Sequence, residues 1–247
     1  MELPARRHEV VNRLVQTSYE HAPYFRFRHG IENPLRFRIY SVWTAAIIAG
    51  GQAKRLGRLD KWALNVGGQR IIDRQLAVLG GVAEHIFVVS SDPHRFRSLG
   101  LRVCADLIPG TGPLGGLYTA LVRSPTEHTL VIACDLPFLA AAFLRYLATQ
   151  IGRADAAMPR TEDGPQPLCA VYTQNCIGAV RAQIQRGQYR MSALEEVIRV
   201  THVGPAEIAA FNRDGKLFLN VNTSNDHLHA TELTALEPNH IKSERRY

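Results

Sequence analysis

The sequence lacks several features that would assign it to common protein classes. No apolar run approaches the roughly 20 residues needed to cross a bilayer, so no membrane-spanning helix is expected. The four cysteines, Cys104, Cys134, Cys169 and Cys176, form no CxxC pair and show no zinc-binding spacing. Such thiols are typical of a reducing cytoplasm, where we expect the protein to act. A serine or cysteine nucleophile arranged with a base is also missing.

Charge of one sign is not concentrated anywhere in the chain. The 247 residues carry a net charge of +7, and 46% apolar with 21% charged residues is typical of globular proteins. Residues 1–43 contribute +3 through seven arginines and four glutamates, and the remainder holds +4. Because nucleic-acid-binding proteins usually cluster their basic residues, this mild excess favours an anionic small molecule over nucleic acid.

Residues 1–43 are set apart because they contain no lysine. Apolar residues within 6–19 predict an amphipathic helix, and alternation over 25–39 predicts a marginal hairpin. The four glutamates argue against a transit peptide, whereas the alternation of arginine with aromatic residues leaves RNA binding open. Since an isolated hairpin is rarely stable, we expect 1–43 to be a poorly docked or flexible extension. A domain over 44–237 and a polar tail over 238–247 would follow it.

From residue 44 onward, short apolar runs alternate with helical patterns. Strands are predicted at Ala45–Ala49, Glu84–Ser90, Leu101–Ala105, Thr129–Cys134, Ala154–Met158 and Leu168–Tyr172. Helices are predicted at Gln69–Leu79, Leu114–Val122, Ala140–Gln150 and from Thr223 or Ser224 to Leu236. This alternation predicts a three-layer α/β/α, Rossmann-like fold with a mostly parallel central sheet. In such a fold, ligands bind beyond the carboxyl ends of the strands.

The first strand ends at Gly50 and Gly51, and a basic loop follows it as far as Lys61. Two glycines after a buried strand let the backbone turn tightly and present N–H groups to a ligand. Basic side chains such as Arg55 would suit a triphosphate there. The kinase-type phosphate loop and the dinucleotide fingerprint are both absent, so a glycine turn that binds no phosphate fits equally well.

Three polar residues follow or end other strands at the same predicted edge. Asp135 directly follows an apolar strand, where it suits Mg²⁺, which takes one or two carboxylates together with substrate phosphates. An aspartate that caps the next turn would give the same pattern. Asp106 leads into the glycine-rich segment 108–116, which would admit a base or ribose or form a simple turn. Ser90 ends the second predicted strand.

Asn220 and Asn222 stand two residues apart near the end of the domain. In an extended segment this spacing places both amides on one side, where they would serve an acceptor substrate. Because Thr223 or Ser224 is a suitable helix cap, a purely structural role for the asparagines stays open.

Five motifs occur together in order: IIAGGxxxRLGxxDK at 47–61, GPLGGL at 112–117, CDLPF at 134–138, QPLCAVY at 166–172 and NVNT at 220–223. As a set they resemble the molybdenum cofactor guanylyltransferases, within the larger nucleotidyltransferase fold, over residues 44–236. The resemblance implies a Mg²⁺-dependent transfer of GMP from GTP to molybdenum-molybdopterin, with release of pyrophosphate. Two departures concern substrate fit, because Gln166 stands where the family often has histidine and Trp62 replaces a small residue.

The resemblance also implies roles for individual residues. The expected nucleotide-binding residues are Ile48, Ala49, Gly50, Gly51, Lys61, Ser90, Asp106 and Asp135. Within this set, Ile48, Ala49 and Gly50 would line guanine and ribose, and Gly51 and Lys61 would hold the triphosphate. Asp135 would also bind Mg²⁺. The expected catalytic residues are Lys61, Asp135 and Arg55.

Expected partners are GTP, molybdenum-molybdopterin and, transiently, the proteins that deliver the pterin. Three other functions stay open at this point. The first is transfer of CMP to the same pterin or of a nucleotide to another small phosphate, and the second is RNA binding through residues 1–43. A catalytically silent interaction protein on this fold is the third, since a fold does not dictate a function.

Overall fold

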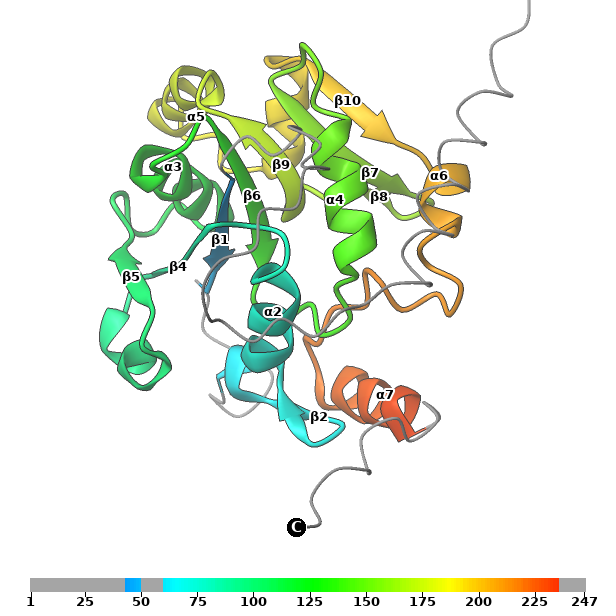
Figure 1. Cartoon of the computed structure of the whole chain (residues 1–247). Helices are drawn as coiled ribbons and strands as arrows, with labels where there is room; N and C mark the ends of the chain where they lie inside the picture. The colour runs from blue at the N-terminus through cyan, green and yellow to red at the C-terminus, as the bar shows by residue number, and fades with distance from the viewer. Residues whose placement is uncertain (1–42, 50–59, 236–247) are drawn as a thin grey trace, which may run out of the picture.

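The computed structural model describes residues 43–49 and 60–235, which form a sheet with helices packed on both sides (Figure 1). The main sheet has the strand order β10-β7-β9-β6-β1-β4-β5, and the short β8 (Gly164–Pro165) pairs with β7 outside this path. In chain order its strands are β1 (Thr44–Ile48), β4 (His85–Ser90), β5 (Arg102–Ala105), β6 (His128–Ala133), β7 (Ala156–Thr161), β9 (Cys169–Thr173) and β10 (Val200–Val203).

The central strand is β1, which pairs in parallel with β4 on one side and β6 on the other. Parallel pairing continues from β4 to β5, and β10 is parallel to β7. Strand β9 runs antiparallel to both of its neighbours, β6 and β7. The sheet is therefore mixed and mostly parallel, as predicted.

Two apolar cores, one on each face of the sheet, explain the layers. Along β1, Ala45 and Ile47 enter the core with α2 (Ile71–Leu79) and α4 (Ala141–Thr149). Ala46 and Ile48 enter the opposite core with α3 (Pro113–Arg123) and α5 (Cys176–Gln185). Because successive side chains of a strand point to opposite faces, an all-apolar strand is expected where both faces are covered. The predicted α/β/α layering is confirmed (Figure 1).

One predicted helix begins later than the sequence suggested. Gln69 and Arg70 form β3 (Gln69–Arg70), which pairs with β2 (Asn65–Val66). Gly67 and Gly68 connect these strands with φ angles of 59° and 85°, values that favour glycine. The tight hairpin uses the residues that were predicted as the first turn of α2, so the helix begins at Ile71.

Other elements agree with prediction to within about three residues, and several were not predicted at all. Helix α7 (Ser224–Ala235) ends the described chain and packs against the β2–β3 hairpin. The elements that were not predicted include α5, β10, α6 (Pro205–Ala209) and three 3-10 helices, η2 (Lys61–Ala63), η3 (Pro93–Leu99) and η4 (Met191–Glu196). Trp43, assigned to the extension, is buried and stacks on His128 with ring centroids 4.9 Å apart.

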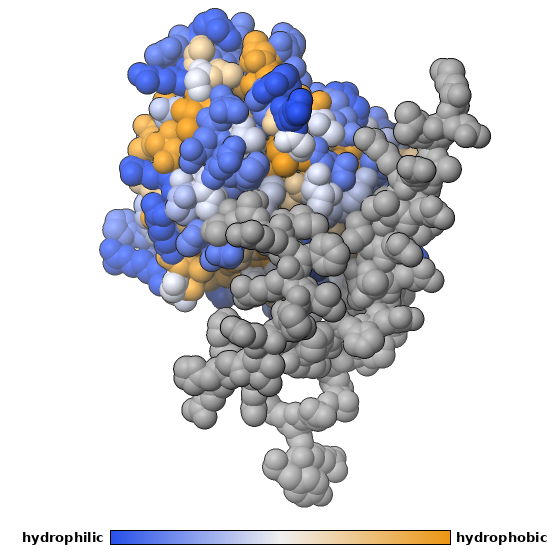
Figure 2. All heavy atoms as spheres, turned by 45° about the horizontal axis from the view of Figure 1, so that its top comes forward, coloured by the Kyte–Doolittle hydropathy of each residue, from blue (hydrophilic) through white to orange (hydrophobic). Residues whose placement is uncertain are grey.

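The described residues give a surface of mixed hydropathy and leave the cysteines unpaired. Figure 2 shows one face on which hydrophobic residues lie among hydrophilic ones. Among the described helices, none is both long enough and apolar enough to span a membrane. All four cysteines are free thiols, and burial raises the pKa of Cys169 to about 12.

The close packing of α3 against β1 predicts how a substitution at Gly116 changes stability, and Gly178 provides a matched control. A Cβ on Gly116 would lie 2.6 Å from Ile48 Cγ2, so Gly116→Ala should lower the free energy of unfolding by about 1–3 kcal/mol. On α5, no described atom lies within 4 Å of a Cβ on the exposed Gly178. Gly178→Ala should therefore raise stability by about 0.5–1 kcal/mol. Urea unfolding measures both, and equal stability of Gly116→Ala and wild type would contradict this packing.

Candidate active site

A cleft of about 400 Å³ lies at the carboxyl ends of β1 and β6. It brings together six residues that were predicted from the sequence: Ile48, Ala49, Lys61, Asp135, Asn220 and Asn222. A larger cavity of about 530 Å³ lies between α2 and the segment 210–217, and none of the predicted residues lines it. Size alone does not identify an active site, and the smaller cleft is the one that combines charged groups with strand ends.

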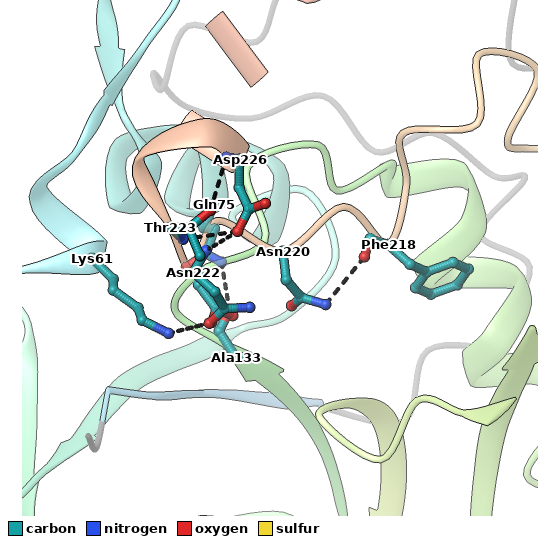
Figure 3. A network of polar contacts seen from close by, with 9 residues as sticks. Lys61, Gln75, Ala133, Phe218, Asn220, Asn222, Thr223 and Asp226 are labelled. Carbon is teal, nitrogen blue, oxygen red and sulfur yellow. Dashed lines mark hydrogen bonds and ion pairs between the residues drawn. The ribbon is translucent and has the colours of Figure 1, made fainter. Parts of the chain in front are cut away.

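The centre of the cleft is a contact between a lysine and two oxygen-bearing side chains. Lys61 Nζ lies 3.1 Å from Asp135 Oδ2. It also donates a hydrogen bond to Asn222 Oδ1 (Figure 3). Lys61 begins η2, Asp135 follows β6 and Asn222 precedes α7, so three distant segments meet here. The lysine neutralises the carboxylate within a largely enclosed site.

Backbone hydrogen bonds hold Asp135 in place from three directions. Ala133 N donates to Leu168 O over 2.7 Å, and Cys134 N donates to Ile48 O over 3.2 Å. From the segment between the two asparagines, Val221 N donates to Asp135 O over 3.0 Å. The aspartate is thus tied to β1, to the residue before β9 and to the asparagine segment.

The residues at the cleft fit a magnesium ion. Asp135 Oδ1 is buried and has no hydrogen-bond partner among the described residues. Within the described ranges, no three His, Cys, Asp or Glu side chains gather as a metal cage. One carboxylate and the amide oxygen of Asn222 would leave coordination positions for phosphate oxygens and water, which is the arrangement that Mg²⁺ favours.

In the segment from Asn220 to Thr223, some groups cap α7 and others face the cleft. Asp226 Oδ2 accepts hydrogen bonds from Asn222 N (2.9 Å) and Thr223 N (2.8 Å), and these bonds lower the pKa of Asp226. Thr223 Oγ1 accepts in return from Asp226 N over 3.2 Å, so Thr223 caps α7 as predicted (Figure 3). The side chain of Asn222 is not needed for this cap and faces Lys61. Asn220 also lines the cleft, and its Nδ2 donates to Phe218 O over 3.2 Å.

Two residues that were predicted to contact the nucleotide, Ser90 and Asp106, are not among the residues that line the cleft, and both stabilise turns. Ser90 Oγ accepts a hydrogen bond from Asp92 N over 3.1 Å at the end of β4. Asp106 Oδ1 accepts from Ile108 N (3.0 Å) and Thr119 Oγ1 (3.1 Å), and so fixes the start of the glycine-rich segment. Their contact with nucleotide stays a prediction. The remaining predicted residues, Gly50, Gly51 and Arg55, lie outside the described residues.

Several residues of the cleft were not assigned roles from the sequence. Arg95, from η3, pairs with Asp60, and the distance from its Nε to Asp60 Oδ2 is 3.1 Å. Trp62 packs on Phe96 with ring centroids 4.7 Å apart. Trp62 also lines the cleft with Gln166, so both departures from the family pattern lie where a substrate would contact them. Nothing in the local sequence marks Arg95, because its place depends on how η3 packs beside η2.

Comparison with known proteins shows the family to which the chain belongs. Residues 45–202 match the model of the MobA-like NTP transferase domain. The probable molybdenum cofactor guanylyltransferase of Pelotomaculum thermopropionicum is 35% identical over 183 residues, which are 74% of this chain and 89% of that protein. A probable molybdenum cofactor guanylyltransferase of Chloroflexus aggregans is 31% identical over 194 residues, or 76% of this chain and 93% of that protein.

A solved structure shares the fold. Molybdopterin-guanine dinucleotide biosynthesis protein A from Archaeoglobus fulgidus superposes with a TM-score of 0.67 at 23% identity. The match covers 78% of this chain and 98% of that one. The family and the reaction class expected from the motifs are both confirmed. The chain belongs to the MobA-like NTP transferases and is a nucleotidyltransferase.

Proposed function

We propose that the chain transfers GMP from GTP to molybdenum-molybdopterin, which yields the molybdopterin guanine dinucleotide cofactor and pyrophosphate. The observation that carries this proposal is the contact of Lys61 with Asp135 and Asn222 at the carboxyl edge of the sheet. These residues belong to motifs that resemble the guanylyltransferases. Relatives that span most of the chain bear that name.

Positioning and charge neutralisation do most of the catalysis in such a transfer. The terminal phosphate oxygen of the pterin attacks the α-phosphorus of GTP, and the bond from that phosphorus to the bridging oxygen of the β-phosphate breaks. Asp135 and the amide oxygen of Asn222 would hold Mg²⁺, which neutralises phosphate charge when it is bound. Lys61 is a mobile point charge suited to the oxygens of the leaving pyrophosphate.

Direct attack by the acceptor agrees with the chemistry of Cys134, the thiol beside Asp135. Burial, aided by the negative charge of Asp135, raises the pKa of Cys134 to about 12. A thiol must lose its proton to act as a nucleophile, so Cys134 is protonated and unreactive at neutral pH.

The metal assignment predicts a large effect of Asp135→Asn. The variant keeps the shape of the side chain but loses the charge, so turnover should fall by about 100-fold or more while the fold persists. Asp155→Asn is the control, because Asp155 pairs with the exposed Arg199 on the surface and should retain wild-type turnover. Pyrophosphate release is measured with molybdopterin and GTP, CTP or ATP, with and without Mg²⁺. A preference for CTP would favour the cytidylyl alternative, and wild-type turnover of Asp135→Asn would refute the metal assignment.

The acceptor assignment predicts opposite behaviour for two neighbouring residues. Asn222→Ala should slow transfer to molybdopterin by about 10-fold or more, because it removes the oxygen that faces Lys61. Its melting temperature should change little. Thr223→Ala removes the cap of α7 and should cost about 1 kcal/mol of stability with near-normal transfer. If Asn222→Ala instead loses stability alone, the asparagine is structural and the acceptor binds elsewhere.

A further inference from the structure

Gln75 is a polar side chain on the otherwise apolar inner face of α2. Ile71, Ile72 and Leu79, the other buried residues of this helix, are aliphatic. The side chain of Gln75 is 1% exposed, and its Nε2 donates to Ala133 O at 2.7 Å (Figure 3). The same nitrogen donates to a second carbonyl, Leu136 O, at 3.0 Å. Both hydrogens of one amide are therefore used on the same short segment of backbone.

Within the part of the chain that the structure describes, the hydrogen bonds of Gln75 leave one polar atom of its own side chain unpaired. Gln75 Oε1 is buried and has no hydrogen-bond partner among the described residues. A buried, unpaired carbonyl costs free energy, and an aliphatic chain of similar length would avoid that cost but would leave Ala133 O and Leu136 O without this donor. The amide therefore serves the two carbonyls that it binds.

The two carbonyls that Gln75 binds flank Cys134 and Asp135. Backbone hydrogen bonds join Ala133, Cys134 and Asp135 of this turn to neighbouring segments. Gln75 adds a side-chain clamp that joins both ends of the turn to α2. A turn that is held at both ends keeps the carboxylate between them in one orientation.

We propose that Gln75 is a positioning residue that fixes the turn 133–136 and thereby aims the Asp135 carboxylate at Lys61 and at the metal site. This inference rests on the proposed function as far as the metal is concerned. Helix α2 contributes no residue to the lining of the cleft, but through Gln75 it would hold the Asp135 carboxylate of the cleft in place. Loss of the clamp would leave the carboxylate present but poorly oriented.

Gln183 provides a matched control on the opposite face of the sheet. It is also 1% exposed and lies within a helix, α5. Its Nε2 donates to a backbone carbonyl, Arg190 O, over 2.7 Å, and its Oε1 has no partner among the described residues. Gln183→Met thus removes the same kind of buried amide without touching the turn at Asp135.

The test compares Gln75→Met, Gln183→Met and wild type by Mn²⁺ titration, followed by electron paramagnetic resonance, with a non-hydrolysable GTP analogue present. Gln75→Met should weaken Mn²⁺ binding by about 10-fold or more, the effect usual for groups that orient a metal ligand. The Mn²⁺ affinity of Gln183→Met should stay within about twofold of wild type, because the loss of this amide affects stability alone. In transfer assays, Gln75→Met should lower kcat at limiting Mg²⁺, should recover partly at high Mg²⁺, and should leave the KM for GTP nearly unchanged.

Hydrogen exchange of the turn separates this inference from the proposed function. Amides of the peptide 131–139 should exchange faster in Gln75→Met than in Gln183→Met, whether or not a metal binds. If wild type binds no Mn²⁺ with the analogue, the proposed function fails, and the exchange data still decide the role of the clamp. Wild-type Mn²⁺ affinity or unchanged exchange in Gln75→Met would overturn the inference. Should Gln75→Met not fold, Gln75→Asn replaces it with the same outcomes, because the shorter amide cannot span both carbonyls.

Discussion

The contact between Lys61 and Asp135 depends on a turn at which four parts of the chain converge. The turn after β6 is tied to β1, to the residue before β9 and to the segment after Asn220 through backbone bonds, and to α2 through Gln75. Parallel strands bring their carboxyl ends to one edge, so a carboxylate there meets residues that are remote in sequence. A carboxylate that faces an ammonium group is favourable only when the geometry is good, and this framework holds the carboxylate in place.

A small apolar cluster beside the sheet joins the segments that carry the polar residues. Its members are Leu64, Val66, Ile71, Phe138, Val221 and Ala230. Leu64 and Val66 follow Lys61, Phe138 follows Asp135, and Val221 lies between the two asparagines. Burial of these side chains draws together the β2–β3 hairpin, the turn after β6 and α7. The polar groups of the cleft are therefore brought together by apolar packing next to them, and not by their own attraction.

The sequence predicted the layers and the strand-end residues because both follow from local patterns. An all-apolar strand such as β1 indicates burial on two faces, and Asp135 is visible as the first charge after such a strand. By contrast, Gln75 looks like an ordinary polar residue within a helix, since its role arises from carbonyls about 60 residues away. The start of α2 was misplaced for a related reason. Pairing of β3 with β2 overrides the helical pattern of residues 69 and 70.

The charge balance among the described residues of the cleft gives a physical reason why a metal would assist nucleotide binding. Among the described residues that line it, Lys61 and Arg95 are cationic and Asp60 and Asp135 are anionic, and they pair two by two. These four groups cancel, so they offer little net attraction to a strongly anionic triphosphate. Lys61 can turn to the phosphates only if another cation replaces it beside Asp135, because an unpaired carboxylate in a partly buried site is costly. A divalent ion that binds Asp135 would therefore release Lys61 for the substrate, and so couple metal binding to nucleotide binding.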